Sequence, residues 1–327
     1  MATLSFSFFI IIISFLFSSY LLEPSVSLPF VVLHGISDSC SGSGVKTFTE
    51  RLANWTGTEG YCVEIADGAW DSWFMPVMEQ MEIACKKVKK IDALSDGYHL
   101  IGLSQGAIIG RALIEFCDEA PQVINFISLA GPHAGIAAIP FCSGEACLYT
   151  DYLMEFLGVY STFIQKHLAP SNYIKITKDY KKYIKGCKFL PQVNNEIEAT
   201  RNSTYKERFE SLEKLVLIMF ENDTVLVPKE TSWFGYYENG TADTLLPANE
   251  TELYIEDWIG LKTLDEAGKV EYFKVPGGHL AITESEMEKY IVPYLGDSSV
   301  DKPVDKSSSG CWWWSQLWNS LIRLLDF

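Results

Sequence analysis

The sequence predicts an α/β fold built on a mainly parallel β-sheet that is covered by helices. Short apolar, β-branched runs alternate with helical patterns from residue 29 to 130, which is typical of right-handed βαβ units. Apolar runs of this kind suit strands that are buried on both faces. The chain has 327 residues, of which 48% are hydrophobic, so it can bury one large core.

The expected elements follow from the periodicity of apolar residues. Strands are expected at Pro29–Leu33, Tyr61–Ile65, Tyr98–Gly102, Val123–Leu129, Lys214–Phe220 and Glu271–Val275. Helices are expected at Val45–Asn54, Trp73–Val88, Ala107–Cys117 and Thr283–Tyr294. The second of these helices is amphipathic, and the last begins with Thr283 and Glu286 in the spacing of a capping box.

The organisation of the chain follows from where the alternation of strands and helices stops. A domain is expected over residues 28–296, with a helical insertion above the sheet at 131–211. Residues 297–310 are rich in Ser, Asp and Lys, which predicts a flexible linker. The Trp-rich tail at 311–327 is too short to span a bilayer, so it either contacts a membrane peripherally or docks on the protein's own surface.

The N-terminal segment predicts entry into the secretory pathway. Residues 1–27 combine an apolar run with small residues at Ser25 and Ser27, as in a cleaved signal peptide. No Lys or Arg precedes the apolar run, so a retained signal anchor is the alternative. We therefore expect the protein to be secreted or to reside in the lumen of the endomembrane system.

Cysteine usage and charge narrow the function classes. Eight cysteines, an even number, favour disulfides in an oxidising lumen, and the absence of CxxC and HxxxH spacing argues against a metal site. Glycosylation sequons occur at Asn54, Asn202, Asn222, Asn239 and Asn249. The formal charge of −16 argues against nucleic acid as a partner and against attraction to anionic lipid surfaces.

Ser104 is the candidate nucleophile. It lies in the segment 102–106, G-L-S-Q-G, which follows an apolar strand and opens a helix. A G-x-S-x-G pattern in this context forms the sharp turn that exposes a serine hydroxyl above the sheet of an α/β-hydrolase. The alternative is a glycine-rich turn with an inert serine, and such a turn requires neither a preceding strand nor a following helix.

A serine hydroxyl needs a base and a carboxylate, which in this fold follow in the order Ser, Asp, His. His279 follows the last strand in a glycine-rich loop, whereas His133 and His167 lie in the expected insertion. Asp223 directly follows an apolar strand, with Asp257 and Asp265 as the rivals.

The oxyanion of an acyl-transfer reaction needs two backbone donors, one after the nucleophile and one after an early strand. The sequence predicts the N–H groups of Gln105 and Ile36 for this role. His34, in the same early loop, is expected to be a structural partner rather than a catalyst.

Beyond these residues, the chain resembles the lysosomal palmitoyl-protein thioesterase family. The matching segments are 34–40 (HGISDSC), 101–106 (IGLSQG), 129–135 (LAGPHAG), 220–223 (FEND), 233–235 (WFG), 253–254 (LY), 260–262 (GLK) and 278–280 (GHL). The resemblance implies an α/β-hydrolase with an acyl-binding groove formed by the insertion. It also implies the triad Ser104, Asp223 and His279, and the oxyanion donors Ile36 and Gln105.

The resemblance further implies two disulfides, Cys85 to Cys117 and Cys142 to Cys147. It leaves four cysteines without an assigned pairing: Cys40, Cys62, Cys187 and Cys311. The chain departs from the family's common pattern at Ile36, where Met is frequent, and at Ala107, where Gly is frequent. The first change should not affect a backbone donor.

The function expected from this resemblance is hydrolysis of long-chain acyl thioesters, in S-acylated proteins or peptides or in acyl-thioester lipids, without metal or cofactor. Two alternatives stay open. One is a lipase or carboxylesterase on the same fold, because function depends on the pocket rather than the fold. The other is a non-catalytic lipid or protein binder.

Overall fold

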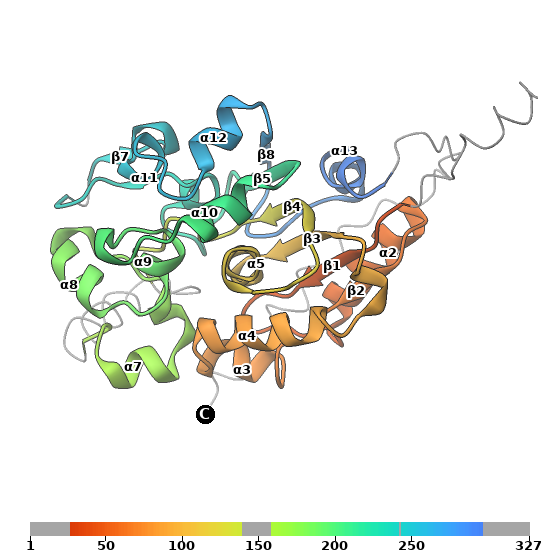
Figure 1. Ribbon diagram of the computed structural model, residues 1–327, viewed down its shortest axis with the longest axis horizontal. Coiled ribbons are helices and arrows are strands. Elements are labelled where there is room, and N and C mark those ends of the chain that lie inside the picture. The colour runs from red at the N-terminus through yellow and green to blue at the C-terminus, as the bar shows by residue number, and fades with distance from the viewer. Residues whose placement is uncertain (1–26, 139–157, 242, 297–327) are drawn as a thin grey trace, which may run out of the picture.

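The computed structural model describes residues 27–138, 158–241 and 243–296 of the chain (Figure 1). Several sequence-based expectations lie outside the described residues: the signal peptide apart from its last residue, the Cys142–Cys147 pairing, the linker, Cys311 and the Trp-rich tail.

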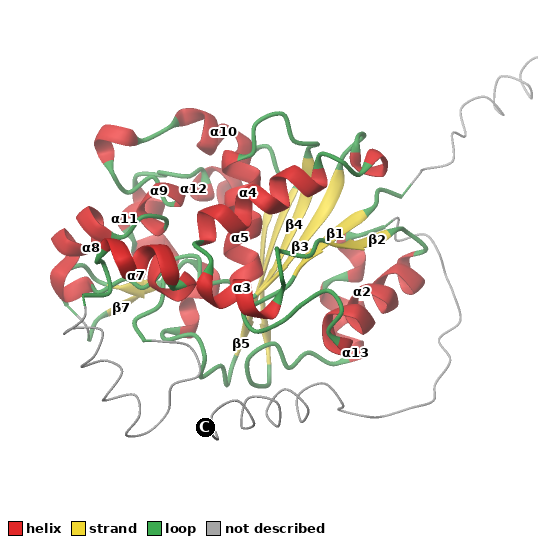
Figure 2. Ribbon diagram, turned by 90° about the horizontal axis from the view of Figure 1, so that it is seen from below, coloured by secondary structure: helices red, strands yellow, loops and turns green. Residues whose placement is uncertain are grey.

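A six-stranded parallel sheet forms the centre of the molecule, in the order β2-β1-β3-β4-β5-β8 (Figure 2). Its strands are β1 (Phe30–Leu33), β2 (Gly60–Cys62), β3 (Tyr98–Leu103), β4 (Val123–Leu129), β5 (Lys214–Phe220) and β8 (Val270–Val275). The expected parallel sheet is confirmed. All residues of β1 and β3 are buried, as expected of strands covered on both faces.

The second strand is shorter than the sequence predicts. It was expected to reach Ile65 but ends at Cys62, where Val63 N–H still donates to Val32 O. The ladder stops there because β1 itself ends at Leu33 and its chain turns away into a loop.

Helices cover both faces of the sheet (Figure 2). One face carries α2 (Ser43–Thr56) and α13 (Glu284–Tyr290), and Thr283 caps α13 in the expected capping box. The other face carries α4 (Val77–Val88), α5 (Gln105–Phe116) and α10 (Ser203–Glu210). Helix α5 has only one residue that is not fully buried, because it lies between the sheet and the helices α4 and α10.

The single helix predicted at 73–88 is wrong, since the structure has two. Helix α3 (Ala69–Phe74) ends before Met75, whose backbone is extended, and α4 follows Pro76. Proline disfavours a helical conformation at the preceding residue and cannot donate a backbone hydrogen bond. The apolar pattern continues across the break although only α4 faces the core, because Phe74 of α3 is 44% exposed and packs against Trp70 instead.

The chain between β4 and β5 forms short helices beside the sheet: α7 (Thr162–His167), α8 (Tyr180–Gly186), α9 (Leu190–Val193) and α10. The buried Arg111 side chain of α5 holds this region in place. Its guanidinium donates to the carbonyls of His133 and Val193, to Asn194 Oδ1 and to Glu115.

The segment between β5 and β8 also contains ordered elements, to which the sequence pattern gave no assignment. They are the hairpin β6 (Tyr236–Tyr237) and β7 (Leu245–Leu246), and the helices α11 (Glu252–Ile255) and α12 (Leu261–Glu266). These elements are two to six residues long, too short to show a periodicity of their own.

Two disulfides are present in the described part of the chain. Cys85–Cys117 joins α4 to the end of α5, as the family resemblance implies. Cys40–Cys62 joins the loop after β1 to the end of β2, a pairing that the sequence left open. Cys187 is a buried free thiol.

No helix within residues 27–138, 158–241 and 243–296 combines the length and the apolar character that crossing a bilayer requires.

Candidate active site

Ser104 lies at the turn between β3 and α5, in a backbone conformation with φ 52° and ψ −118°. The two glycines of the motif permit this turn. A Cβ on Gly102 would lie 2.3 Å from Ala107 Cα, and one on Gly106 would lie 2.3 Å from Leu33 O. Because both clashes are with backbone, only glycine fits at either position.

The structure brings the three residues selected from the sequence into one hydrogen-bonded chain. Ser104 Oγ lies 2.8 Å from His279 Nε2, and His279 Nδ1 lies 2.7 Å from Asp223 Oδ2. The Asp223 side chain is fully buried, and that of His279 is 8% exposed. A base held between a serine hydroxyl and a buried carboxylate is the arrangement that activates a serine for nucleophilic attack.

The loops after β5 and β8 carry Asp223 and His279, and hydrogen bonds within and between these loops orient the two side chains. Asp223 Oδ1 accepts the backbone N–H groups of Val225 and Leu226, at 2.8 and 3.0 Å. Asn222 N–H donates to Gly277 O, which ties the aspartate loop to the histidine loop. The carboxylate is thus oriented by three donors, of which His279 is one.

The other candidates for the catalytic acid and base do not belong to this hydrogen-bonded chain. Asp257 accepts from Lys262 N–H and Thr263 Oγ1, and Asp265 accepts from the hydroxyl of Tyr254. His167 is exposed on α7. His133 is fully buried beside Ser128, where burial and the charge of Arg111 lower its pKa well below the usual value.

The two predicted oxyanion donors flank the nucleophile. Neither the Ile36 nor the Gln105 backbone N–H has a hydrogen-bond acceptor among the described residues, so both are free to bind a substrate oxygen. Gly35 brings the Ile36 loop close to the elbow, since a Cβ there would lie 3.1 Å from Leu103 O and 3.3 Å from Ser104 Cβ. Gln105 also begins α5, where free N–H groups favour negative charge.

Contacts on several sides brace the loop that carries Ile36. Ser37 N–H donates to Ser72 Oγ at 2.8 Å, and the indole N–H of Trp73 donates to Ser37 Oγ. Cys40 is bonded to Cys62, and its N–H donates to Glu64 Oε2. These contacts would hold the predicted Ile36 donor in place before substrate binds, as electrostatic catalysis requires.

His34 is a structural residue, as its sequence position suggested. It is 1% exposed, and its Nε2 lies 2.9 Å from Glu64 Oε1. Burial alone would raise the pKa of the Glu64 carboxyl, but the hydrogen bond and charge of His34 hold that pKa below its usual value. Glu64 Oε2 accepts the Cys40 N–H at 2.8 Å, so the same carboxylate contacts both His34 and the loop after β1.

A buried polar network supports the Gln105 side of the site, and the sequence gave no indication of it. Gln105 Nε2 donates to Ser72 O and to Gln80 Oε1, at 2.8 and 3.1 Å. The hydroxyl of Tyr173 donates to Gln105 Oε1 at 2.9 Å. Each contact joins residues at least 25 positions apart, which no local pattern reports.

Within the ranges that the structure describes, no group of three or more His, Cys, Asp or Glu side chains is arranged to hold a metal ion.

A serine, an aspartate and a histidine that follow strands β3, β5 and β8 of a parallel sheet, beside two free N–H donors, define a serine hydrolase of the α/β-hydrolase class. The family model for palmitoyl protein thioesterase matches residues 29–279. The chain belongs to this family.

Curated relatives agree with this assignment. Palmitoyl-protein thioesterase 1 of Caenorhabditis elegans is 36% identical over 81% of this chain and 90% of its own length. Palmitoyl-protein thioesterase 3 of Dictyostelium discoideum is 33% identical over 83% of this chain and 90% of its own length. Among solved structures, a monoacylglycerol lipase of Paleococcus ferrophilus has a TM-score of 0.45 and 15% identity, over 82% of this chain and 93% of that one.

Proposed function

We propose that this protein hydrolyses long-chain fatty acyl thioesters, such as palmitoyl groups on cysteine residues of proteins or peptides. The observation that carries the proposal is the Ser104–His279–Asp223 chain in a member of the palmitoyl protein thioesterase family. The relatives from C. elegans and D. discoideum, which are named palmitoyl-protein thioesterases, support the substrate class.

The geometry supports a two-step acyl transfer. Ser104 Oγ attacks the thioester carbonyl while His279 Nε2 takes its proton, and the N–H groups of Ile36 and Gln105 stabilise the oxyanion. The C–S bond then breaks, and His279 returns the proton to the leaving thiolate. This step leaves Ser104 acylated.

In the second step a water molecule attacks the acyl-enzyme, with His279 as the base. Collapse of the second tetrahedral intermediate releases the fatty acid and restores the Ser104 hydroxyl. Asp223 keeps the imidazole in the required tautomer and stabilises its protonated form. Three side chains and water thus account for every proton, and the mechanism calls for no cofactor.

The proposed location is the lumen of the secretory pathway, and more specifically a lysosome or vacuole. Two disulfides support an oxidising lumen. Relatives from Drosophila melanogaster and mouse are named lysosomal thioesterases. Peripheral membrane contact by the tail at 311–327 stays a prediction, because the tail lies outside the described residues.

Replacing the nucleophile tests the proposed function. Ser104→Ala should abolish release of thiol from a palmitoyl-thioester peptide, because no other group can form the acyl-enzyme. Release is followed with a thiol reagent, and a matched palmitoyl oxygen ester is assayed in parallel. Unchanged turnover by Ser104→Ala would reject the nucleophile. Turnover of the oxygen ester alone would replace the thioesterase assignment by that of an esterase.

A further inference from the structure

Helices α3 and α7 carry an exposed aromatic cluster. Trp70 and Phe74 of α3 are 66% and 44% exposed, and their rings pack together with centroids 4.4 Å apart. Phe163 of α7 is 68% exposed. The two helices contact each other, and they lie side by side in both views of the fold (Figures 1 and 2). A contiguous apolar cluster on a protein surface that is exposed to water usually marks an interaction site.

Exposed lysines gather beside this cluster. They lie on α7, on α8 and in the segments that flank α8: Lys166, Lys178, Lys181, Lys185 and Lys188. None of the five has an acidic partner among the described residues. Helix α7 is joined to the end of α8, because Lys188 N–H donates to Gln165 Oε1 at 2.9 Å. Thr162, the neighbour of Phe163 on α7, lines one hollow together with Lys185 and Lys188, so the lysines lie next to the α7 end of the aromatic cluster.

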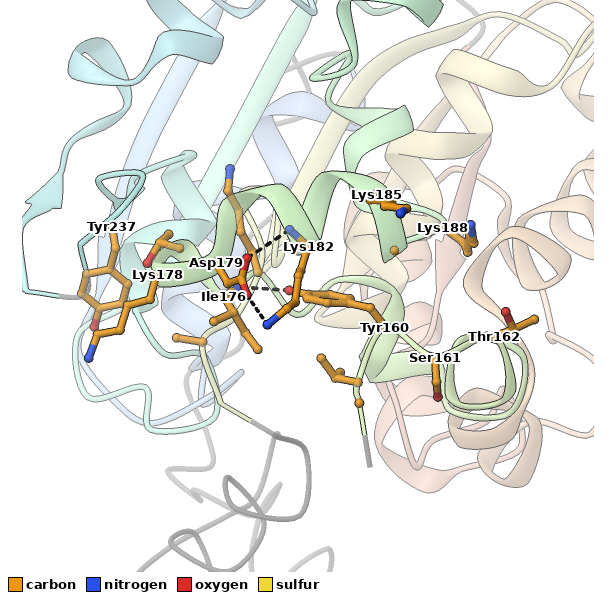
Figure 3. Close-up of a pocket in the computed structure, with 16 residues that line it drawn as sticks. Tyr160, Ser161, Thr162, Ile176, Lys178, Asp179, Lys182, Lys185, Lys188 and Tyr237 are labelled. Atoms are coloured by element: carbon orange, nitrogen blue, oxygen red, sulfur yellow. Dashed lines mark hydrogen bonds and ion pairs between the residues drawn. The ribbon is translucent and has the colours of Figure 1, made fainter. Parts of the chain in front are cut away.

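Three of these five lysines line a hollow of about 970 Å³ (Figure 3). Lys178, Lys185 and Lys188 contribute to its wall, together with Lys175, which pairs with Glu196, and Lys182, which pairs with Asp179. Asp179 is the single acidic residue among those that line it. This local excess of positive charge contrasts with the formal charge of −16 for the whole chain.

The whole-chain charge, which argued against anionic lipid surfaces, does not describe this side of the molecule. Charges separated by more than about 8 Å are largely screened at physiological ionic strength. A surface that approaches the lysines closely therefore experiences them more than it experiences distant acidic residues, and the acidic residues beside the aromatic cluster are Asp67 and Asp71. Aromatic side chains beside lysines are the combination by which proteins bind the interface of a membrane.

The aromatic cluster is also connected to the active site. Between Trp70 and Phe74 on α3 lie Ser72 and Trp73, which hydrogen-bond to Ser37 in the oxyanion loop. The carbonyl of Ser72 also accepts from the Gln105 side chain. An object bound at Trp70 and Phe74 thus lies within one helical turn of residues that support the oxyanion donors.

We propose that the α3–α7 face, formed by Trp70, Phe74 and Phe163 with the lysines beside them, docks the enzyme on an anionic lipid bilayer. The proposal rests on the proposed function in one respect, since a long acyl chain resides in a membrane and the enzyme must meet it there. The aromatic side chains enter the interface and the lysines bind lipid phosphates and carboxylates. Docking holds the site at the membrane surface.

The test measures binding of the full-length protein to vesicles without substrate, so its outcome does not depend on catalysis. Co-sedimentation with phosphatidylcholine vesicles that contain phosphatidylserine should exceed that with phosphatidylcholine alone, and salt should weaken it. The aromatic variant W70S/F74S/F163S and the charge-reversal variant K178E/K185E/K188E should each lower the partition coefficient by about tenfold or more.

Matched variants on other surfaces serve as controls. L245S/I255S replaces apolar residues that are 39% and 58% exposed on β7 and α11. K86E/K89E/K90E reverses exposed lysines at the far end of α4. Both should bind vesicles like the unmodified chain, and thermal unfolding confirms that each variant is folded.

Three results would overturn the proposal. The unmodified chain could show no preference for phosphatidylserine, or both test variants could bind like the controls, which would assign the contact to another part of the chain. The third result would be that the unmodified chain does not bind vesicles but associates with itself or with another protein, and that the aromatic variant abolishes this association. Hydrolysis of a soluble acyl thioester by the unmodified chain is measured separately, so failure of the proposed function remains distinguishable.

Discussion

At the scale of the residue, Asp223 combines complete burial with three hydrogen-bond donors. Two are backbone N–H groups in its own loop, and the third is the His279 ring. An ionised carboxylate can only accept hydrogen bonds, so it favours the histidine tautomer that carries its proton on Nδ1 and leaves Nε2 free to take a proton from Ser104.

Replacing this carboxylate by an amide should therefore impair the chemical step. Asp223→Asn is expected to lower kcat by about 10³- to 10⁴-fold, because the amide can no longer hold His279 in the reactive tautomer. Asp265→Asn is the control, since Asp265 bonds to Tyr254 away from the site. Steady-state kinetics on a palmitoyl thioester decide the matter, and a loss below tenfold for Asp223→Asn would contradict the assignment.

His99 on β3 makes folding stability sensitive to acid. Its side chain is buried, with an unpaired Nδ1, and burial lowers its pKa from the usual 6.5 to about 4. The unfolded chain binds the proton at higher pH than the folded one does. The stability that a neutral His99 provides is therefore present above pH 6.5 and is lost as the pH falls toward 4.

The size of this effect is about 3 kcal/mol over the whole interval, at 1.36 kcal/mol per pKa unit. His99→Gln should flatten the decline of unfolding free energy between pH 6.5 and 4. Denaturant titrations at several pH values measure it. His167→Gln, on the surface of α7, should leave the decline unchanged, and an equal slope for His99→Gln and the unmodified protein would refute the explanation.

At the scale of the element, the loop after β1 is the most heavily braced part of the site. A disulfide, a carboxylate and a serine hydroxyl each hold it, through Cys62, Glu64 and Ser72. Ser72 belongs to helix α3, which also carries the exposed aromatic side chains Trp70 and Phe74. Helix α3 therefore supports the loop of the predicted oxyanion donor Ile36 and carries two aromatic residues of the proposed membrane-docking face.

Removing the Cys40–Cys62 bridge should affect both stability and catalysis. The bridge spans 22 residues, and a loop of that length gives about 3 kcal/mol in the chain-entropy model. C40S/C62S should also lower kcat, because the Ile36 donor is less firmly held. Thermal unfolding and kcat are measured together.

The second disulfide provides the matched control. C85S/C117S should cost similar stability while retaining kcat, since it joins α4 to the far end of α5. If C40S/C62S does not fold, Glu64→Gln keeps the bridge and weakens the hydrogen bond from Cys40 N–H. Full kcat in both C40S/C62S and Glu64→Gln would show that the bracing is irrelevant to catalysis.

At the scale of the whole molecule, the sequons lie where glycans can be attached. Four of the five asparagines are exposed, and Asn202 is half-buried as the N-cap of α10. The exposed ones are Asn54, Asn222, Asn239 and Asn249. Glycosylation at these positions stays a prediction.

Asn222 is the most informative sequon because it adjoins Asp223. Thr224→Ala removes this sequon without altering either residue, and Thr224 is exposed. We expect glycopeptide mass spectrometry of protein from the secretory pathway to show the loss of one glycan, at position 222. Turnover should stay within about twofold, as for most surface changes. An unmodified Asn222 in the parent protein would exclude this glycan.

Local patterns determined much of the fold and selected the candidate site. Strands β4 and β5 were predicted with their observed bounds, because both segments are dominated by apolar residues, as strands buried in a parallel sheet are. Ser104 was marked by glycines that flank a strand-to-helix turn, and His279 and Asp223 by their place after later strands. The structure brings these three side chains together, while their catalytic roles await the substitutions described above.

Only the tertiary structure decided which distant residues meet. It paired Cys40 with Cys62, joined Gln105 to Gln80 and Tyr173, and divided the helix predicted at 73–88. It also placed the lysines around α8 next to α7, which in turn contacts α3. Periodicity and spacing report what one segment can form by itself. Contacts between loops depend on how separate segments pack, and no single stretch of sequence contains that information.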